Sequence, residues 1–99
     1  KKSASEPALN DGKQFVSSRL NPFRYPEITV KKGIPLHWEI DAPENALNGC
    51  NYRMIFRDFG FMYDLDYGKN VIEFTPEKAG TFQYTCWMGM VRGIIKVEE

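Results

Sequence analysis

Short stretches in which apolar and polar residues alternate recur along this chain of 99 residues. The clearest is residues 36–40, where Leu36, Trp38 and Ile40 alternate with polar residues. A period of two places such apolar side chains on one face of an extended strand. Gly, Pro and Asn interrupt the stretches, and no long helical pattern occurs, so we predict an all-β sandwich or barrel of about seven or eight strands. Strands are expected at residues 14–20, 28–31, 36–40, 52–56, 61–65, 71–74, 81–86 and 91–97.

The length and composition indicate one domain without a nucleic-acid-binding surface. The formal net charge is zero, from 13 basic and 13 acidic residues, and no basic stripe is present. No apolar run approaches the roughly 18 residues that span a bilayer. Residues 1–13 are polar and contain Pro, Gly and Ser, so we predict a flexible lead-in or linker there and a folded domain at 14–99.

The sulfur-containing side chains gather in two short segments. Cys86, Met88 and Met90 occupy alternate positions of the sequence Cys-Trp-Met-Gly-Met. Cys50, the other of the two cysteines, lies in a second glycine-containing turn. Thiolate and thioether sulfurs are soft donors, which select Cu(I) over the harder divalent ions. These four residues are therefore the candidate ligands of a cuprous site, with two core methionines as the alternative for Met88 and Met90.

Strand parity directs both cysteines inward. Cys86 shares one face of its strand with Phe82 and Tyr84, and Cys50 shares parity with Met54. Each cysteine falls at a strand end, so the two thiols lie close together if these ends meet at one pole of a sandwich. Metal binding, a structural disulfide and a pair of buried free thiols all remain compatible with this placement.

The residues around the sulfur motif point to binding rather than catalysis. Trp87 either lies over the site as a shield or packs on a neighbouring loop as a surface aromatic. His37, the one histidine, has parity opposite to its apolar neighbours and is expected to face solvent away from both cysteines. No paired carboxylates, nucleophile–base pair or phosphate-cradling glycine loop is present, so we expect no enzymatic activity.

Three segments resemble the cupredoxin family. Residues 26–38, with the sequence PEITVKKGIPLHW, resemble the early strand pair of the family with its Lys-Lys-Gly turn. Cys50-Asn51 stands where cupredoxins place a ligand His followed by Asn, and residues 75–86 resemble the segment that leads into the ligand loop. The resemblance covers roughly residues 28–97 and implies a cupredoxin-like Greek-key β-sandwich or barrel.

The departures from the family pattern concern the metal ligands. A blue-copper site needs two His and one Cys with a weak axial Met. Here Cys50 replaces the first ligand His, and Met88 falls where the second is expected. The set is similar to the copper-handling cupredoxin domains of bacterial copper-resistance systems, including membrane-anchored streptococcal chaperones and amino-terminal domains of copper-exporting ATPases. That resemblance implies one or two Cu(I) per domain, held by Cys50, Cys86, Met88 and Met90.

We interpret the chain as a Cu(I)-binding chaperone module for copper resistance and copper transport. The resemblance implies hand-off to a copper-exporting P-type ATPase or its metal-binding domain, with any membrane tether outside this chain. The cytoplasmic face of the membrane is the expected location, and an extracytoplasmic one is the alternative. Two other functions stay open: a cupredoxin electron carrier, and a structural β-sandwich with a Cys50–Cys86 disulfide.

Overall fold

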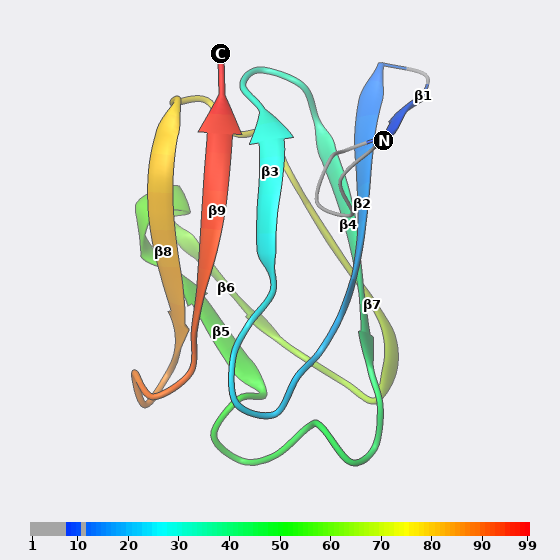
Figure 1. Ribbon diagram of the computed structural model, residues 1–99, viewed down its shortest axis with the longest axis vertical. Helices are drawn as coiled ribbons and strands as arrows, with labels where there is room; N and C mark the ends of the chain where they lie inside the picture. The colour runs from blue at the N-terminus through cyan, green and yellow to red at the C-terminus, as the bar shows by residue number, and fades with distance from the viewer. Residues whose placement is uncertain (1–7, 11) are drawn as a thin grey trace.

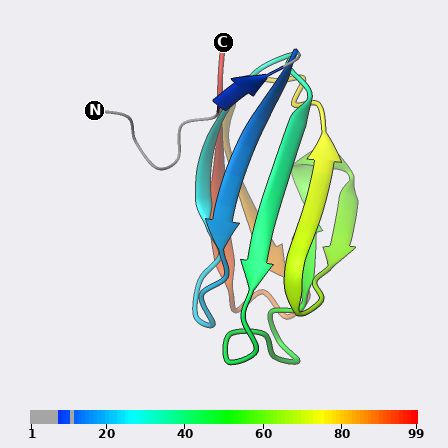
Figure 2. The ribbon, with the colours of Figure 1, turned by 90° about the vertical axis from the view of Figure 1, so that its right-hand side faces the viewer.

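The computed structural model describes residues 8–10 and 12–99, which form a sandwich of two sheets (Figures 1 and 2). Nine strands and one short 3-10 helix make up this described part. They are β1 (Ala8–Asn10), β2 (Lys13–Arg19), β3 (Glu27–Lys31), β4 (Leu36–Ala42), β5 (Arg53–Phe56), η1 (Arg57–Phe59), β6 (Phe61–Asp64), β7 (Gly68–Phe74), β8 (Gly80–Cys86) and β9 (Arg92–Glu98). The all-β prediction is confirmed.

The strands are distributed over the two sheets in a non-sequential order. One sheet has the order β1-β2-β4-β7, and the other has the order β3-β9-β8-β5-β6. The pairs β2–β4 and β3–β9 are parallel, whereas the remaining neighbours are antiparallel. Segments far apart in the sequence therefore become neighbours, as β3 and β9 do at the front of Figure 1.

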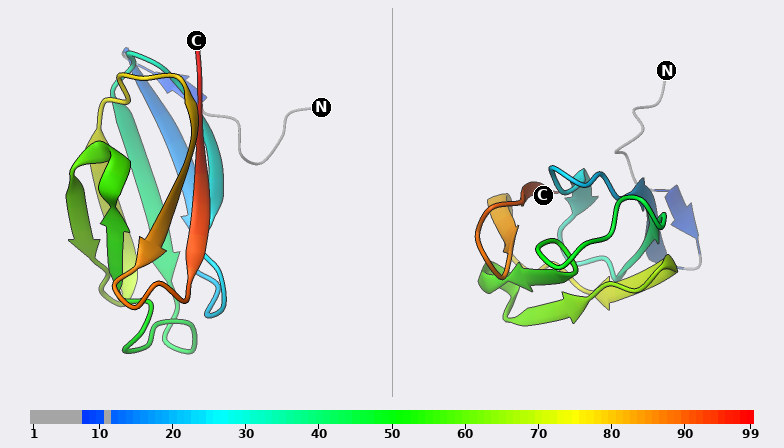
Figure 3. Two further views of the ribbon diagram at one scale, coloured as in Figure 1. Left: turned by 90° about the vertical axis from the view of Figure 1, so that its left-hand side faces the viewer. Right: turned by 90° about the horizontal axis from the view of Figure 1, so that it is seen from below.

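The ends of four strands place their loops at one pole of the sandwich. Strands β2, β4, β6 and β8 all end there, so the connecting loops 20–26, 43–52, 65–67 and 87–91 lie together (Figure 3). We call this end the sulfur pole, because both cysteines belong to it. No helix in residues 8–10 and 12–99 has the length and apolar character needed to cross a membrane.

An aromatic cluster fills the space between the sheets. Trp38 of β4 is fully buried and meets Phe56 and Tyr84 edge-on, with ring centroids 5.9 and 5.7 Å apart. Phe56 and Tyr84 stack on each other at 4.8 Å. Burying such rings removes 150–250 Å² of surface each, so this cluster dominates the apolar contribution to stability. The alternation in residues 36–40 thus marks the core face, as predicted from the sequence.

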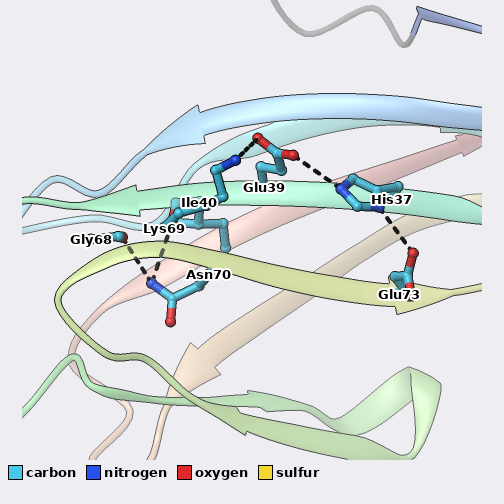
Figure 4. Close-up of polar contacts among 7 residues, drawn as sticks. All are labelled: His37, Glu39, Ile40, Gly68, Lys69, Asn70 and Glu73. Atoms are coloured by element: carbon cyan, nitrogen blue, oxygen red, sulfur yellow. Dashed lines mark hydrogen bonds and ion pairs between the residues drawn. The ribbon is translucent and has the colours of Figure 1, made fainter.

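Three buried polar side chains each fix a loop to the sandwich. Gln14 donates to the carbonyls of Lys31 and Ile34 and accepts from the amide of Lys31, which fixes the β3–β4 turn. Asn70 donates to the carbonyls of Ile40 and Gly68 (Figure 4) and so holds the start of β7. The third, Asn51, acts at the sulfur pole. Buried amides remain favourable because every donor and acceptor is satisfied.

The predicted lead-in at residues 1–13 needs correction where the structure describes it. Residues 1–7 and 11 lie outside the described residues. Ala8–Asn10 form β1, which pairs antiparallel with β2, and Lys13 already belongs to β2. Gly12, with φ of 75°, makes the reversal between them. A strand of three residues is too short to show an alternating pattern in the sequence, and its pairing with β2 appears only in the fold.

Gly93 allows two tyrosine rings to stack beside β9. The rings of Tyr25 and Tyr84 lie parallel at 5.3 Å. A Cβ atom at position 93 would lie 2.6 Å from the ring of Tyr84 and 2.7 Å from the Cβ of Tyr25. Neither neighbour is the free end of a flexible side chain, so the position requires glycine for steric reasons.

We predict that Gly93→Ala destabilises the domain by about 1–3 kcal/mol, because overpacking forces the two rings apart. Urea unfolding followed by tryptophan fluorescence measures the change. Gly49→Ala is the matched control, since an added Cβ there meets no atom within 4 Å. Equal midpoints for Gly93→Ala and the unsubstituted protein would contradict the packing argument.

Candidate metal centre at the sulfur pole

The two cysteines meet at the sulfur pole. Cys86 ends β8 and is almost fully buried, whereas Cys50 lies in the β4–β5 loop and is partly exposed. Their Sγ atoms are 3.6 Å apart, and both are free thiols. The inward direction predicted for Cys86 is confirmed. Cys50 sits in a turn and precedes β5 by three residues, so it lies next to the strand predicted at 52–56, which begins at Arg53.

An asparagine pair shapes the turn that presents Cys50. The side-chain oxygen of Asn48 accepts from the amides of Cys50 and Asn51, both at 2.8 Å. Asn51 is fully buried, accepts from the amide of Asn48 and donates to the carbonyl of Ala46 at 2.7 Å. The hydroxyl of Tyr25 donates to the carbonyl of Asn51 at 2.6 Å. These side-chain hydrogen bonds satisfy backbone groups that have no strand partner here, and they fix the turn against the core.

The β8–β9 loop wraps around the sulfur of Cys86. The amide of Gly89 donates to the carbonyl of Cys86 at 3.0 Å, which closes a tight turn. Gly89 has φ of 75°, a left-handed conformation that glycine adopts without strain. The turn aims the amides of Met90 and Val91 at Cys86 Sγ, each 3.3 Å away. Amide donors of this kind stabilise a thiolate.

The loop methionines are exposed rather than packed in the core. Met88 is 51% exposed and Met90 is 73% exposed. The chain turns at Gly89, so neither residue continues the strand of Cys86, and the parity expected for an extended chain does not apply beyond that cysteine. Both thioethers nevertheless belong to the five-residue segment that carries Cys86. The backbone of this segment thus stays close to Cys86, while the two methionine side chains reach solvent.

Trp87 connects the two halves of the site. Its indole N–H donates to the carbonyl of Gly49 at 3.0 Å, and its amide donates to the carbonyl of Arg53 at 3.1 Å. About half of the side chain is exposed. The indole therefore packs on the neighbouring Cys50 loop, which is the surface-aromatic alternative of the sequence analysis. Its role as a shield of the site stays a prediction.

The environments of the two thiols push their pKa values in opposite directions. The pKa of Cys50 is raised by its hydrogen bond with Cys86, by desolvation and by the charge of that neighbour. Burial alone would raise the pKa of Cys86, but the amide donors of Val91 and Met90 and the thiol of Cys50 outweigh it, so the pKa is lowered. Cys86 is therefore the thiol that loses its proton first. The pKa of Tyr25 is raised, by burial and then by the charges of the two cysteines.

His37 lies outside this site. It stands near the start of β4, a strand that ends at the sulfur pole, on the face opposite to the buried Leu36 and Trp38. The ring contacts Phe15 at 4.9 Å and reaches the carboxylates of Glu73 and Glu39 at 2.9 and 3.1 Å (Figure 4). The predicted separation from the sulfur motif agrees with this position. The side chain is partly covered by these neighbours instead of lying free in solvent.

The donor set decides which metals this pole can hold. Among residues 8–10 and 12–99, no group of three or more His, Cys, Asp or Glu side chains gathers in a way that could hold a metal ion. The sulfur pole offers two thiols and two nearby thioethers instead. Hard ions such as Mg²⁺ and Ca²⁺ need several oxygen ligands, and structural zinc sites use Cys and His rather than Met. Soft sulfur donors fit Cu(I).

The fold is a cupredoxin-like β-sandwich. A reduced amicyanin variant, a solved structure, is 21% identical, with a TM-score of 0.54 over 95% of this chain and 93% of that chain. The metal-binding domain of the Cu(I)-exporting P-type ATPase CopA from Streptococcus pneumoniae D39, solved with Cu(I), is 24% identical. Its TM-score is 0.79 over 95% of this chain and 94% of that chain, which again establishes the fold.

A third structure establishes the family. A copper-binding protein solved in its apo form by NMR is 30% identical, with a TM-score of 0.82, over 97% of this chain and 100% of that chain. This chain therefore belongs to the same family as that copper-binding protein. No family model and no curated protein sequence matches the chain.

We predict that Asn51→Ala loosens the Cys50 turn and destabilises the domain. The substitution leaves the carbonyl of Ala46 and the amide of Asn48 without their hydrogen-bond partner. A buried polar group left unpaired lowers the free energy of unfolding by about 1–3 kcal/mol. Urea unfolding measures the stability, and amide exchange measures the opening of loop 43–52. Asn21→Ala is the matched control, because its exposed side chain accepts only from the amide of Phe23 among the described contacts. Unchanged stability and exchange in Asn51→Ala would contradict the role of the network.

We predict that His37 gives the domain a stability that declines as pH rises above the ordinary histidine pKa of 6.5. Its hydrogen bonds to Glu73 and then Glu39 raise its pKa above the ordinary 6.5. The protonated ring therefore stabilises the fold fully below the unfolded pKa, and this stabilisation is lost as pH rises through the folded pKa.

Urea unfolding in the presence of a reductant should show this decline in the unsubstituted protein and a flatter profile in His37→Gln. NMR titration of the imidazole gives the pKa directly. A ring that titrates at or below 6.5 would contradict the assignment.

Proposed function

We propose that this domain binds Cu(I) at the sulfur pole and passes it to a partner that exports copper. The observation that carries the proposal is the pair of free thiols 3.6 Å apart beneath a loop of exposed thioethers. Membership in a family with a copper-binding protein supports the choice of metal. Cys50 and Cys86 would be the primary ligands, and Met88 and Met90 would complete the coordination.

The thiol separation favours a bent site with room for a third donor. Two sulfurs 3.6 Å apart subtend an angle of about 100° at an ion about 2.3 Å from each, the usual metal–thiolate length for zinc. A linear two-coordinate arrangement would need a wider separation. The remaining positions suit a thioether, and Met88 and Met90 stand on the adjacent loop with exposed side chains.

Charge supports a capacity of one or two ions. One Cu(I) with two thiolates has a net charge of minus one, and two Cu(I) with the same thiolates are neutral. Neutral clusters cost less to place beside a buried core, because an unpaired charge in a low-dielectric region is strongly disfavoured. Thioethers add donors without adding charge. We therefore propose a tight position at the two cysteines and a weaker one completed by the methionines.

The protons of the thiols make binding depend on pH. Each thiol must lose its proton to become a ligand, so Cu(I) competes with protons at both positions. The amides of Met90 and Val91 favour the thiolate of Cys86, which would take the ion first. Cys50, with its raised pKa, would complete the pair on binding. Affinity should therefore fall as pH falls.

The biological role follows from the exposure of the loop. A ligand set that reaches solvent allows a partner's thiolate to enter before copper leaves. We propose a non-enzymatic chaperone module, like the streptococcal copper chaperone CupA, with a copper-exporting P-type ATPase or its metal-binding domain as the receiver. The structural likeness to the metal-binding domain of such an ATPase supports this context. The cytoplasmic face of the membrane is the proposed location.

Anaerobic titration with Cu(I) against a chelator tests the site. We expect one or two equivalents for the unsubstituted protein, and a loss of about 100-fold or more in affinity for Cys50→Ser and Cys86→Ser, because a hydroxyl is a hard donor. Met90→Leu should weaken the second position by about tenfold. Met62→Leu is the matched control, since Met62 is also exposed but lies on β6 away from the pole loops.

Three outcomes would overturn this function. Unchanged Cu(I) affinity in both serine variants would remove the assigned ligands. Thiol counting before copper is added addresses the structural alternative, which the short thiol separation also allows. Two reactive thiols support the metal site, whereas none, even after treatment with a reductant, would favour a permanent Cys50–Cys86 disulfide. An intense thiolate-to-Cu(II) band would instead indicate an electron carrier.

A further inference from the structure

A groove lies between the β2–β3 loop and the start of β9. Its volume is about 710 Å³, and its lining includes Arg24, Phe23, Tyr25 and Arg92. The groove adjoins the sulfur site through the chain itself. Arg92 follows Val91, whose amide contacts the sulfur of Cys86, and the hydroxyl of Tyr25 reaches the Cys50 loop.

The groove carries positive charge that its own surroundings do not balance. Among the described residues, Arg24 and Arg92 form no ion pair, and both are exposed. A third lining arginine, Arg19, pairs with Asp41 at 3.5 Å. The one carboxylate of the lining, Glu27, is already paired with Lys96 at 3.1 Å. In a chain of zero net charge, this is a local positive surface.

Large exposed apolar side chains concentrate at the same pole. Of the seven that the described residues expose, five belong to the loops of the sulfur pole. The most exposed is Phe23, at 83%, on the rim of the groove. The five are Phe23, Tyr67, Trp87, Met88 and Met90. Aromatic residues, Met and Arg are the types enriched at protein interfaces, and Arg and Trp are frequent hot spots.

We propose that the arginine groove and the sulfur loop together form the docking surface for a partner protein with an acidic surface around its own copper-binding thiols. This inference rests on the proposed function, for which it specifies the surface chemistry of the partner. Positive charge beside the thiol pair would attract the partner's carboxylates and orient its thiolate toward the site. The exposed apolar side chains would supply the contact area.

The shape of the surface favours a protein over a membrane. A lipid surface is flat on this scale and does not fill a concave groove, whereas the side chains of a partner do. The transfer itself involves no change of oxidation state. In each of two steps, a bond forms between Cu(I) and a thiolate of the partner while the bond between Cu(I) and one domain cysteine breaks, until both domain cysteines have released the ion. The proton released by the incoming thiol is balanced by the proton that the departing cysteine takes up.

A pair of charge-reversed variants tests the proposal. Arg24→Glu with Arg92→Glu removes the positive groove, and Arg57→Glu with Lys78→Glu makes the same change of net charge away from the sulfur pole. The probes are two synthetic peptides of equal length that carry one cysteine among acidic or among uncharged polar residues. Stopped-flow measurement of Cu(I) transfer from the loaded domain gives the rates.

We expect transfer to the acidic peptide to be at least about tenfold faster than to the uncharged peptide at low salt, with the difference lost at about 0.5 M salt. The groove variant should lose this preference and retain its Cu(I) affinity, while the control variant keeps both. Equal rates for the two peptides, or an equal loss in the control variant, would overturn the docking surface.

A copper-free measurement separates this proposal from the proposed function. The acidic peptide with serine in place of its cysteine is titrated into the reduced, metal-free domain, and NMR shifts are followed. Shifts centred on loop 20–26 and on the start of β9 support the docking surface even if Cu(I) titration were to fail. If the peptide causes no NMR shifts while Cu(I) binding is intact, the docking surface is overturned and the proposed Cu(I)-binding function is not. Binding to anionic lipid vesicles without peptide binding would overturn it in favour of a membrane surface.

Discussion

The hydroxyl of Tyr25 makes the contact on which the sulfur pole depends. Its bond to the carbonyl of Asn51 fixes the Cys50 turn, while its ring stacks on Tyr84 in the core. Its amide donates to the carbonyl of Arg92, which ties β9 to the same residue. A single buried side chain thus connects the core, the thiol turn and the groove. Because buried hydrogen bonds are costly to break, these three regions should keep one relative geometry.

The two halves of the sulfur pole differ in exposure, and the difference suits the transfer proposed for its ion. Cys86 is buried at a strand end and held by amide donors, whereas Met88 and Met90 extend into solvent. A rigid thiolate lowers the entropic cost of binding, since little of it has to be ordered. Exposed thioethers lose more freedom on binding and so would bind more weakly. In the proposed site, tight retention and ready release would therefore come from different ligands.

Period-two alternation predicted the strands and the inward direction of Cys86 because burial on one face of a strand leaves a regular signal. The roles of Gln14, Asn51 and Asn70 leave no such signal, since one buried amide in a polar segment looks like any exposed amide. Some of their partners are backbone groups far along the chain, as Lys31 is for Gln14 and Ile40 is for Asn70, and only the folded chain brings these groups together. The alternating pattern did not predict the positions of the two thioethers, because it applies only to an extended chain and the chain turns at Gly89.

The sandwich topology explains why binding and docking features share one pole. Four strands end there, so loops separated by up to about seventy residues in sequence meet at one surface. The loops and strand ends contribute different elements: Arg24 from the loop 20–26, Arg92 from the start of β9, the Cys50 turn from the loop 43–52, and the thioethers from the loop that follows Cys86. Side chains of surface loops do not have to pack in the core, so the sequence of a loop can vary. The positions of the loops are fixed by the strand ends that they join. Affinity for the ion and choice of partner can therefore vary independently, because the first depends on sulfur geometry and the second on surface charge beside it.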